Sequence, residues 1–229
     1  MKIHPKNLLN YLIYRASFLL LPGLLFSCSQ TESTQNTLPI LGERETVEQV
    51  INGKTVTDTI YHQIPDFSFI NQDSQQVTSQ TLAGKIYVTD FFFTTCPTIC
   101  PKMKSQLLRV YEKFKNNDQV VLLSHTIDPQ HDSVAVLRDY AERLGVSSNK
   151  WHFVTGAKDS VYAIAAKYMV TAGEDENEAG GFVHSGAFIL VDTNRHVRGI
   201  YDGTIAEQVD KLIQDIPLLL AEKSQHAKN

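Results

Sequence analysis

Two cysteines are the residues of this chain whose type and spacing could do chemistry. Cys96 and Cys100 lie four residues apart and each is followed by a proline, in the stretch 90–101 that reads DFFFTTCPTICP. An apolar, strand-like run leads into the pair and a helical pattern follows it. The thiolate form of cysteine is both a nucleophile and a ligand for soft metal ions, so the pair could serve redox or metal chemistry.

The spacing of Cys96 and Cys100 fits a single helical face. Four residues of helix give about 6 Å of rise and roughly 40° of rotation. Both sulfurs would then lie within reach of a disulfide or of one metal ion. A helix N-terminus favours the thiolate, and Pro97 suits the first helical turn. A metal site, a dithiol–disulfide redox site and a structural disulfide remain open, although a loop this small gains little from a disulfide.

The elements around the pair alternate between strands and helices. Short strands are expected around Phe69 and Val77, and longer strands at 86–93, 119–128, 151–154, 187–191 and 196–201. Helices are expected at 102–114, 133–144, 159–168 and 204–221, and a Gly- and acid-rich loop at 171–182. Alternation of this kind implies a parallel sheet with crossovers, to which the last hairpin adds antiparallel strands. The sequence therefore predicts a thioredoxin-like α/β fold, with a central mixed sheet flanked by helices.

The first residues have the pattern of a targeting signal. Lys2, Lys6 and Arg15 carry the only formal charges before Cys28, and an apolar run extends from about position 8 to 26. A basic segment followed by an apolar one is typical of a secretory signal peptide. We therefore expect residues 1–27 to be a signal peptide, which places the protein in the cell envelope, outside the cytoplasm.

Cys28 has its own interpretation as a lipidation site. The sequence Leu-Phe-Ser-Cys at 25–28 resembles the lipobox of a bacterial lipoprotein, in which the cysteine carries the lipid. Acyl chains contribute roughly 0.8 kcal/mol per buried CH₂, so several of them would anchor the protein to a membrane. The alternative is an uncleaved N-terminal anchor with an incidental cysteine. Residues 28–37 are polar and are expected to be a flexible tether.

The remaining chain is expected to be one domain with a short arm and a tail. An Asn-Gly turn at 52–53 suggests a β-hairpin within an N-terminal extension at 38–63, followed by the domain at 64–222 and a frayed tail at 223–229. The full chain has 21 basic and 25 acidic residues, a net charge of −4. Removal of residues 1–27 takes away three basic residues and leaves a net charge of −7. No basic patch points to nucleic acid as a partner.

Four stretches, in this order and spacing, resemble the Sco/SenC copper chaperones. The first is the Cys-x-x-x-Cys-Pro motif after a strand. The others are TIDPQHDS at 126–133, WHFVTG at 151–156, and His184-Ser185 before a strand that ends in Leu-Val-Asp at 190–192. The match runs from about position 64 to 203. Phe92 departs from the pattern, because many members have glycine there.

The resemblance implies a thioredoxin fold and a copper site. It carries the ligands over to Cys96, Cys100 and His184, with copper bound as Cu(I) and Cu(II) and the two cysteines as a redox-active dithiol. Two thiolates and one imidazole suit Cu(I). The implied function is delivery of copper to, or maturation of, the binuclear copper centre of a respiratory cytochrome c oxidase. The implied partners are a copper-receiving oxidase subunit and a periplasmic thiol reductant or another copper carrier.

Asp128 and Asp132 lie at and just after the end of the strand expected at 119–128. Two interpretations of their role have similar weight. In one, Asp128 closes its own turn and Asp132 or Ser133 caps the following helix. In the other, a carboxylate contacts the ligands and orients His184 or tunes the thiolates.

Two classes of function stay in competition. A metallochaperone needs Cys96, Cys100 and His184, and this class is favoured over an enzyme. A thiol–disulfide oxidoreductase that reduces partner cysteines before metal loading needs the two cysteines but not the histidine. A peroxide-scavenging thiol enzyme is a weaker third possibility.

Overall fold

The computed structural model describes residues 37–226, including side chains as far as position 222. The expected signal peptide, the lipidation site Cys28 and all but the last residue of the expected tether lie outside these residues. None of the helices that the described residues form is long and apolar enough to span a bilayer.

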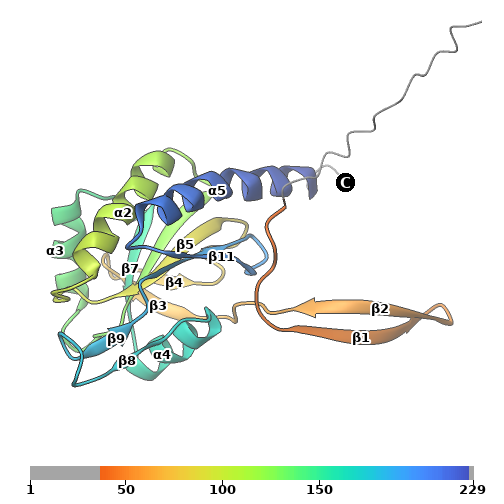
Figure 1. Cartoon of the computed structure of the whole chain (residues 1–229), viewed down its shortest axis with the longest axis horizontal. Coiled ribbons are helices and arrows are strands. Elements are labelled where there is room, and N and C mark those ends of the chain that lie inside the picture. Colours follow the sequence, from red (N-terminus) through yellow and green to blue (C-terminus); the bar gives the residue numbers. More distant parts are fainter. Residues whose placement is uncertain (1–36, 227–229) are drawn as a thin grey trace, which may run out of the picture. The chain divides into compact units, whose positions relative to one another are not determined.

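A seven-stranded mixed sheet forms the centre of the domain (Figure 1). Its strands, in the spatial order of the sheet, are β11 (Val197–Asp202), β10 (Ala187–Val191), β5 (Ile86–Phe92), β6 (Val120–Thr126), β7 (Trp151–Thr155), β3 (Ser68–Asn71) and β4 (Gln76–Thr78). Strands β5, β6 and β7 are parallel, and the outer strands pair antiparallel. Every residue of β5, β6 and β10 is buried, which explains their near-continuous apolar sequences.

Within residues 37–226, four helices cover the sheet, namely α2 (Cys100–Phe114), α3 (Val134–Leu144), α4 (Lys158–Lys167) and α5 (Ala206–His226). Helices α2, α3 and α5 lie on one face and α4 on the other (Figure 1). Their caps follow the sequence: the Ser133 hydroxyl accepts a hydrogen bond from the Val136 N–H, and Gly145 ends α3 in the left-handed conformation. Helix α5 continues to His226, so residues 223–226, expected to fray, are helical.

The predicted position of the cysteines on the helix is wrong in one respect. Helix α2 begins at Cys100, with Ile99 as its N-cap, and Cys96 lies in the preceding bend. Pro101, not Pro97, occupies the first turn. Proline cannot donate a hydrogen bond to the residue four positions earlier, so a helix that included Pro97 would leave its carbonyl without a partner at Pro101.

The expected loop at 171–182 contains a small hairpin instead. Strand β8 (Ala172–Glu174) pairs antiparallel with β9 (Phe182–His184). In this register His184 is opposite Ala172. The histidine is therefore the last residue of a strand, where backbone pairing fixes its position.

The N-terminal arm is the predicted β-hairpin. Strands β1 (Arg44–Ile51) and β2 (Lys54–Tyr61) pair along their whole length. Asn52 and Gly53 both have positive φ, as the tight turns of two-residue hairpins require. Nearly all side chains of the two strands are exposed.

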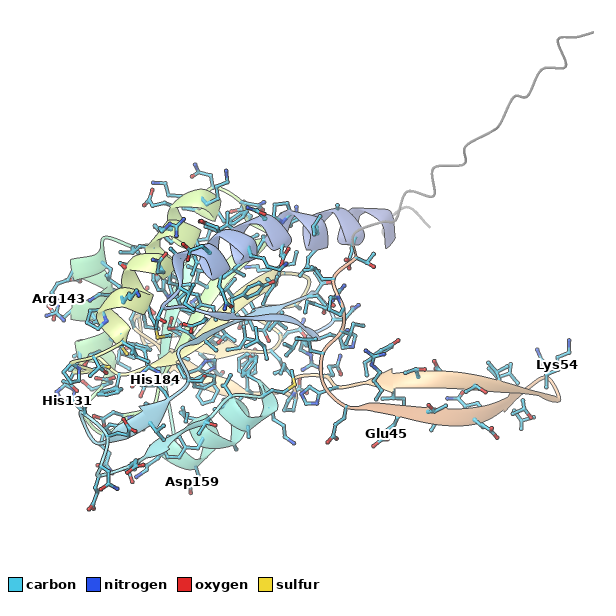
Figure 2. The ribbon with its side chains drawn as sticks, in the orientation of Figure 1. Glu45, Lys54, His131, Arg143, Asp159 and His184 are labelled. Atoms are coloured by element: carbon cyan, nitrogen blue, oxygen red, sulfur yellow. The ribbon has the colours of Figure 1, made fainter. Side chains whose placement is uncertain are left out.

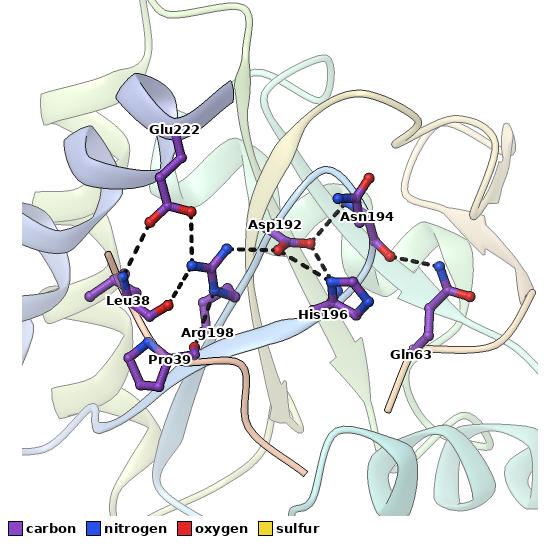
Figure 3. Close-up of polar contacts among 8 residues, drawn as sticks. All are labelled: Leu38, Pro39, Gln63, Asp192, Asn194, His196, Arg198 and Glu222. Carbon is purple, nitrogen blue, oxygen red and sulfur yellow. Dashed lines mark hydrogen bonds and ion pairs between the residues drawn. The ribbon is translucent and has the colours of Figure 1, made fainter. Parts of the chain in front are cut away.

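A buried arginine attaches the segment before this arm to the sheet (Figure 3). Arg198 in β11 donates hydrogen bonds to the Asp192 and Glu222 carboxylates, at 2.9 and 2.8 Å. It also donates to the carbonyls of Leu38 and Pro39, and the Leu38 N–H donates to Glu222. We call these five residues the Arg198 clamp. Because β10 runs antiparallel to β5, the clamp and the cysteines lie at opposite ends of the sheet.

Candidate metal and thiol site

The end of β5 positions the two thiols. The strand stops at Phe92, and the Cys96 N–H donates to the Phe93 carbonyl at 3.3 Å, which closes a turn. Cys100 follows as the first residue of α2. Both cysteines are free and nearly buried, with exposed fractions of 8% for Cys96 and 6% for Cys100.

His184 completes a group of three ligand atoms. Its Nε2 lies 3.3 Å from the Cys100 Sγ and 3.9 Å from the Cys96 Sγ. The two sulfurs and the nitrogen all lie within 4.8 Å of one another. The other ring nitrogen, Nδ1, is 3.3 Å from the Ser185 carbonyl, which can only accept. With Nδ1–H donated there, Nε2 faces the thiols: when protonated it donates to the Cys96 thiolate, and when deprotonated it offers its lone pair to a metal ion.

The donor set fits a soft metal ion. Thiolate sulfur selects Cu(I), zinc and iron–sulfur clusters, and imidazole also binds copper and zinc. The three donors that converge in the described part of the chain suit the low coordination number of Cu(I). The chemistry of the donors therefore admits the copper ion that the sequence resemblance implied.

The two thiols differ in acidity. Burial opposes ionisation of Cys96, but hydrogen bonds from His184 and from the N–H groups of Thr98 and Cys100 lower its pKa to about 6. Burial raises the pKa of Cys100 far above its usual value. Near neutral pH the metal-free site thus holds one thiolate, at Cys96, and one thiol.

Phe93 forms one wall of the site. Its ring meets the His184 imidazole edge to face, with 5.8 Å between centroids, and packs against Phe182 at 5.0 Å. Gly180 has φ of +92°, and a Cβ there would lie 2.9 Å from the Phe93 ring. The glycine lets the loop between β8 and β9 lie directly on Phe93. Phe92, which departs from the family pattern, packs instead between Tyr140 and Phe153.

Asp132 stabilises the turn that precedes Cys96 and is bonded to Thr94 and Thr126 rather than to a proposed metal ligand. Its fully buried carboxylate accepts hydrogen bonds from the Thr94 N–H at 3.0 Å, the Thr94 hydroxyl and the Thr126 hydroxyl. His131 lies 3.0 Å away on the exposed side. These bonds join the turn that precedes Cys96 to the end of β6. The cap of α3 is Ser133, so the capping reading of Asp132 is wrong.

Asp128 is bonded within its own turn. Its carboxylate accepts from the His131 N–H at 3.3 Å, and its N–H donates to the Thr126 hydroxyl at 3.1 Å. These bonds agree with the interpretation that Asp128 closes its own turn. Both His131 and His184 lie at the end of the domain where α2 begins (Figure 2).

Asp90 is a residue that sequence reasoning missed. Its carboxylate is 5% exposed, accepts a hydrogen bond from the Ser124 hydroxyl, and lines a small cavity together with Cys100. Burial raises its pKa to about 6, although the bond from Ser124 opposes this. The available signal was a carboxylate inside an otherwise apolar strand, since such a residue is rarely buried without a partner.

Comparison with known proteins gives one consistent family. A family model described as SCO1/SenC matches residues 56–221. The "SCO1 protein homolog" of Bacillus subtilis (strain 168) is 30% identical over 169 residues, which are 72% of this chain and 86% of the relative.

Solved structures agree with this family. A SCO1/SenC family lipoprotein from Bacillus anthracis str. Ames has a TM-score of 0.64 at 26% identity, over 69% of this chain and 95% of that one. BsSco, described as a member of the Sco family of cytochrome c oxidase assembly proteins with a disulfide switch, has a TM-score of 0.61 at 28% identity, over 68% and 92%. Arabidopsis thaliana ScoI with copper bound has a TM-score of 0.56 at 26% identity, over 67% and 97%. The predicted family resemblance and the thioredoxin-like α/β fold are thereby confirmed.

Proposed function

Because the chain belongs to the SCO1/SenC family, we propose that it is a copper chaperone. It binds copper and delivers it to, or helps to mature, the binuclear copper centre of a respiratory cytochrome c oxidase. The observation that carries this proposal is the convergence of two sulfurs and one imidazole nitrogen within 4.8 Å. The copper-bound Arabidopsis relative and the oxidase-assembly description of BsSco support it. The direct partner is then a copper-receiving oxidase subunit.

Cys96, Cys100 and His184 are the proposed ligands, and copper is the cargo. Binding displaces the proton of the Cys100 thiol, since the thiolate is the ligand form. His184 is half-buried on a two-stranded hairpin, whereas both sulfurs are nearly buried. The imidazole is therefore the donor that a partner's ligand can replace first, and the thiolates hold the ion until the exchange is complete.

We place the domain outside the cytoplasm, attached to a membrane by lipid on Cys28. The pattern of residues 1–28 supports this arrangement, as does the Bacillus anthracis relative, which is described as a lipoprotein. After loss of residues 1–27 the net charge of −7 favours protein partners over nucleic acid.

Copper titration of the reduced protein tests the proposal. Wild type is expected to bind one copper ion, and His184→Ala to bind it at least about tenfold more weakly, because one of three ligands is lost. His131→Ala is the matched control, since that histidine is exposed and lies near the site. Unchanged affinity and stoichiometry in His184→Ala would remove this residue from the site.

A thiol–disulfide oxidoreductase is the second candidate, favoured by the unequal acidity of the two thiols. The Cys96 thiolate would attack a partner disulfide and form a mixed disulfide, releasing one partner thiolate. The Cys100 thiol would then lose its proton and attack the Cys96 sulfur, forming the Cys96–Cys100 disulfide while the second partner sulfur leaves and takes up a proton, so the partner is fully reduced. A periplasmic thiol reductant must supply two electrons to restore the dithiol.

The histidine separates the two candidates. If His184→Ala retains full activity in oxidase assembly while Cys96→Ser loses it, the reductase function is favoured. If both variants lose activity, the three-ligand copper function is favoured.

A further inference from the structure

A buried carboxylate lies directly behind the proposed copper ligands. Asp90 is in β5, and strand alternation turns its side chain toward the face that α2 and α3 cover. Asp90, Cys100 and Ser124 line one cavity of about 10 Å³, about the space of a single water molecule. The acid and a proposed ligand cysteine thus face the same small cavity, and the charge of Asp90 acts on the Cys100 thiol.

Two further buried groups hold this carboxylate in place. The Ser124 hydroxyl donates to Asp90, and the Trp151 indole N–H donates to the Ser124 oxygen at 2.8 Å. Ser124 and Trp151 are each 1% exposed. With the indole donor fixed, the hydroxyl proton of Ser124 must point at Asp90, so the charge has a defined position. Such a chain of donors stabilises the ionised carboxylate.

Other ionisable groups lie near the same cavity. Lys104 and Tyr140 line it, and the Lys104 ammonium sits 5.0 Å over the centroid of the Tyr140 ring. In the metal-free protein, a protonated His184 interacts electrostatically with Asp90 and favours its charged form. The charge of Asp90 therefore faces both Cys100 and the imidazole ligand, through an interior that screens charge poorly.

The charge of the copper site depends on the oxidation state of its cargo. Two thiolates and a neutral imidazole give a net charge of −1 with Cu(I) and zero with Cu(II). A nearby negative charge disfavours the more negative complex. We propose that Asp90 is a positioning residue that acts through Cys100 to shift the preference of this site toward Cu(II). The inference rests on the proposed copper function and deepens it.

The ratio of Cu(I) affinity to Cu(II) affinity isolates this effect. Both complexes form from the same metal-free protein, so any influence of Asp90 on thiol ionisation or folding cancels in the ratio. A merely structural role for Asp90 would weaken both ions together and leave the ratio unchanged.

The experiment compares wild type with Asp90→Asn as full chains. Competition with one Cu(I) chelator and one Cu(II) chelator at pH 7.5 gives the two affinities. Asp90→Asn keeps the side-chain shape and removes the charge, so the Cu(I)/Cu(II) affinity ratio is expected to rise about tenfold or more. Asp215→Asn is the matched control, because that residue is also 5% exposed but its carboxylate is bonded to Tyr201 on β11 and to Lys211 on α5. It is expected to change the ratio less than about twofold.

If Asp90→Asn does not fold, Ser124→Ala tests whether the charge of Asp90 sets the Cu(I)/Cu(II) affinity ratio. It retains the carboxylate but removes the donor that stabilises its charge, so the ratio is expected to rise in the same direction by a smaller factor. A ratio within about twofold of wild type in the folded variants would overturn the inference alone. If wild type binds no copper through Cys96, Cys100 and His184, the proposed function fails and the inference fails with it.

Discussion

The two ends of the central sheet differ in how their polar groups are paired. At the end of the Arg198 clamp, one buried guanidinium meets two carboxylates and two backbone carbonyls. At the other end, Cys96, Cys100 and His184 direct their ligand atoms toward one another. The polar groups of the clamp are satisfied by hydrogen bonds to one another. The thiol end gathers donors that a soft cation satisfies, so stability and function are assigned to opposite ends.

Loss of the clamp is expected to have the largest effect and to leave copper binding intact. Arg198→Met leaves the buried Asp192 and the partly buried Glu222 carboxylates without their guanidinium partner, which is expected to lower the free energy of unfolding by about 3 kcal/mol. Urea unfolding measures this change. Arg195→Met is the control, because its ion pair with the largely exposed Asp66 is screened by solvent and is expected to contribute little to stability. A drop in the copper affinity of folded Arg198→Met would contradict the separation of the two ends.

Asp132 is expected to matter at the thiol end through the turn that it holds. Asp132→Asn weakens the hydrogen bonds to Thr94, so the turn before Cys96 loosens and copper affinity is expected to fall about tenfold. Chelator competition measures it. The matched variant Asp128→Asn perturbs a carboxylate bonded within its own turn and is expected to change affinity less than about twofold. Equal losses in both variants would refute a specific role for Asp132.

The acidity of Cys96 offers a pH-dependent comparison. A thiolate reacts with alkylating reagents and a thiol does not, so alkylation of metal-free Cys96 is expected to fall as the pH drops through about 6. In His184→Ala, burial persists but one hydrogen bond to the thiolate is lost, so the midpoint is expected to move to higher pH. Mass spectrometry after timed alkylation measures both midpoints. A midpoint that does not move would show that His184 does not stabilise the thiolate.

Two neighbouring glycines give the smallest expected difference. Gly180 and Gly181 both have positive φ, so alanine at either position is expected to cost about 1 kcal/mol of folding stability. Only the Cβ at Gly180 would meet the Phe93 ring, because nothing lies within 4 Å of the one at Gly181. Copper affinity is therefore expected to fall a few-fold in Gly180→Ala only. Equal affinities in the two variants would show that Phe93 does not position His184.

Burial decided which elements the sequence predicted well. Strand β10 has the predicted bounds and β5 falls one residue short of its prediction, because both strands are buried on two faces and read as apolar runs. Strands β8 and β9 have three residues each and are partly exposed, so they leave no apolar pattern. The start of α2 was readable from Pro101, whose missing N–H confines it to a first turn.

The site was only half predictable from the residues themselves. Cys96 and Cys100 are close in sequence, and their spacing alone indicated a shared site. His184 lies 84 residues beyond Cys100, and no local pattern brings it to the thiols. The family resemblance supplied that pairing, and the fold brings the three residues together. Asp90 escaped notice because its partners Ser124 and Trp151 come from other strands.

X-ray absorption at the copper edge of the Cu(I)-loaded protein tests the central claim most directly. A copper site with three protein ligands should show two sulfur neighbours and one nitrogen neighbour in wild type, and should lose the nitrogen neighbour in His184→Ala. Two sulfurs alone in wild type, or an identical spectrum in the variant, would contradict a copper site formed by Cys96, Cys100 and His184.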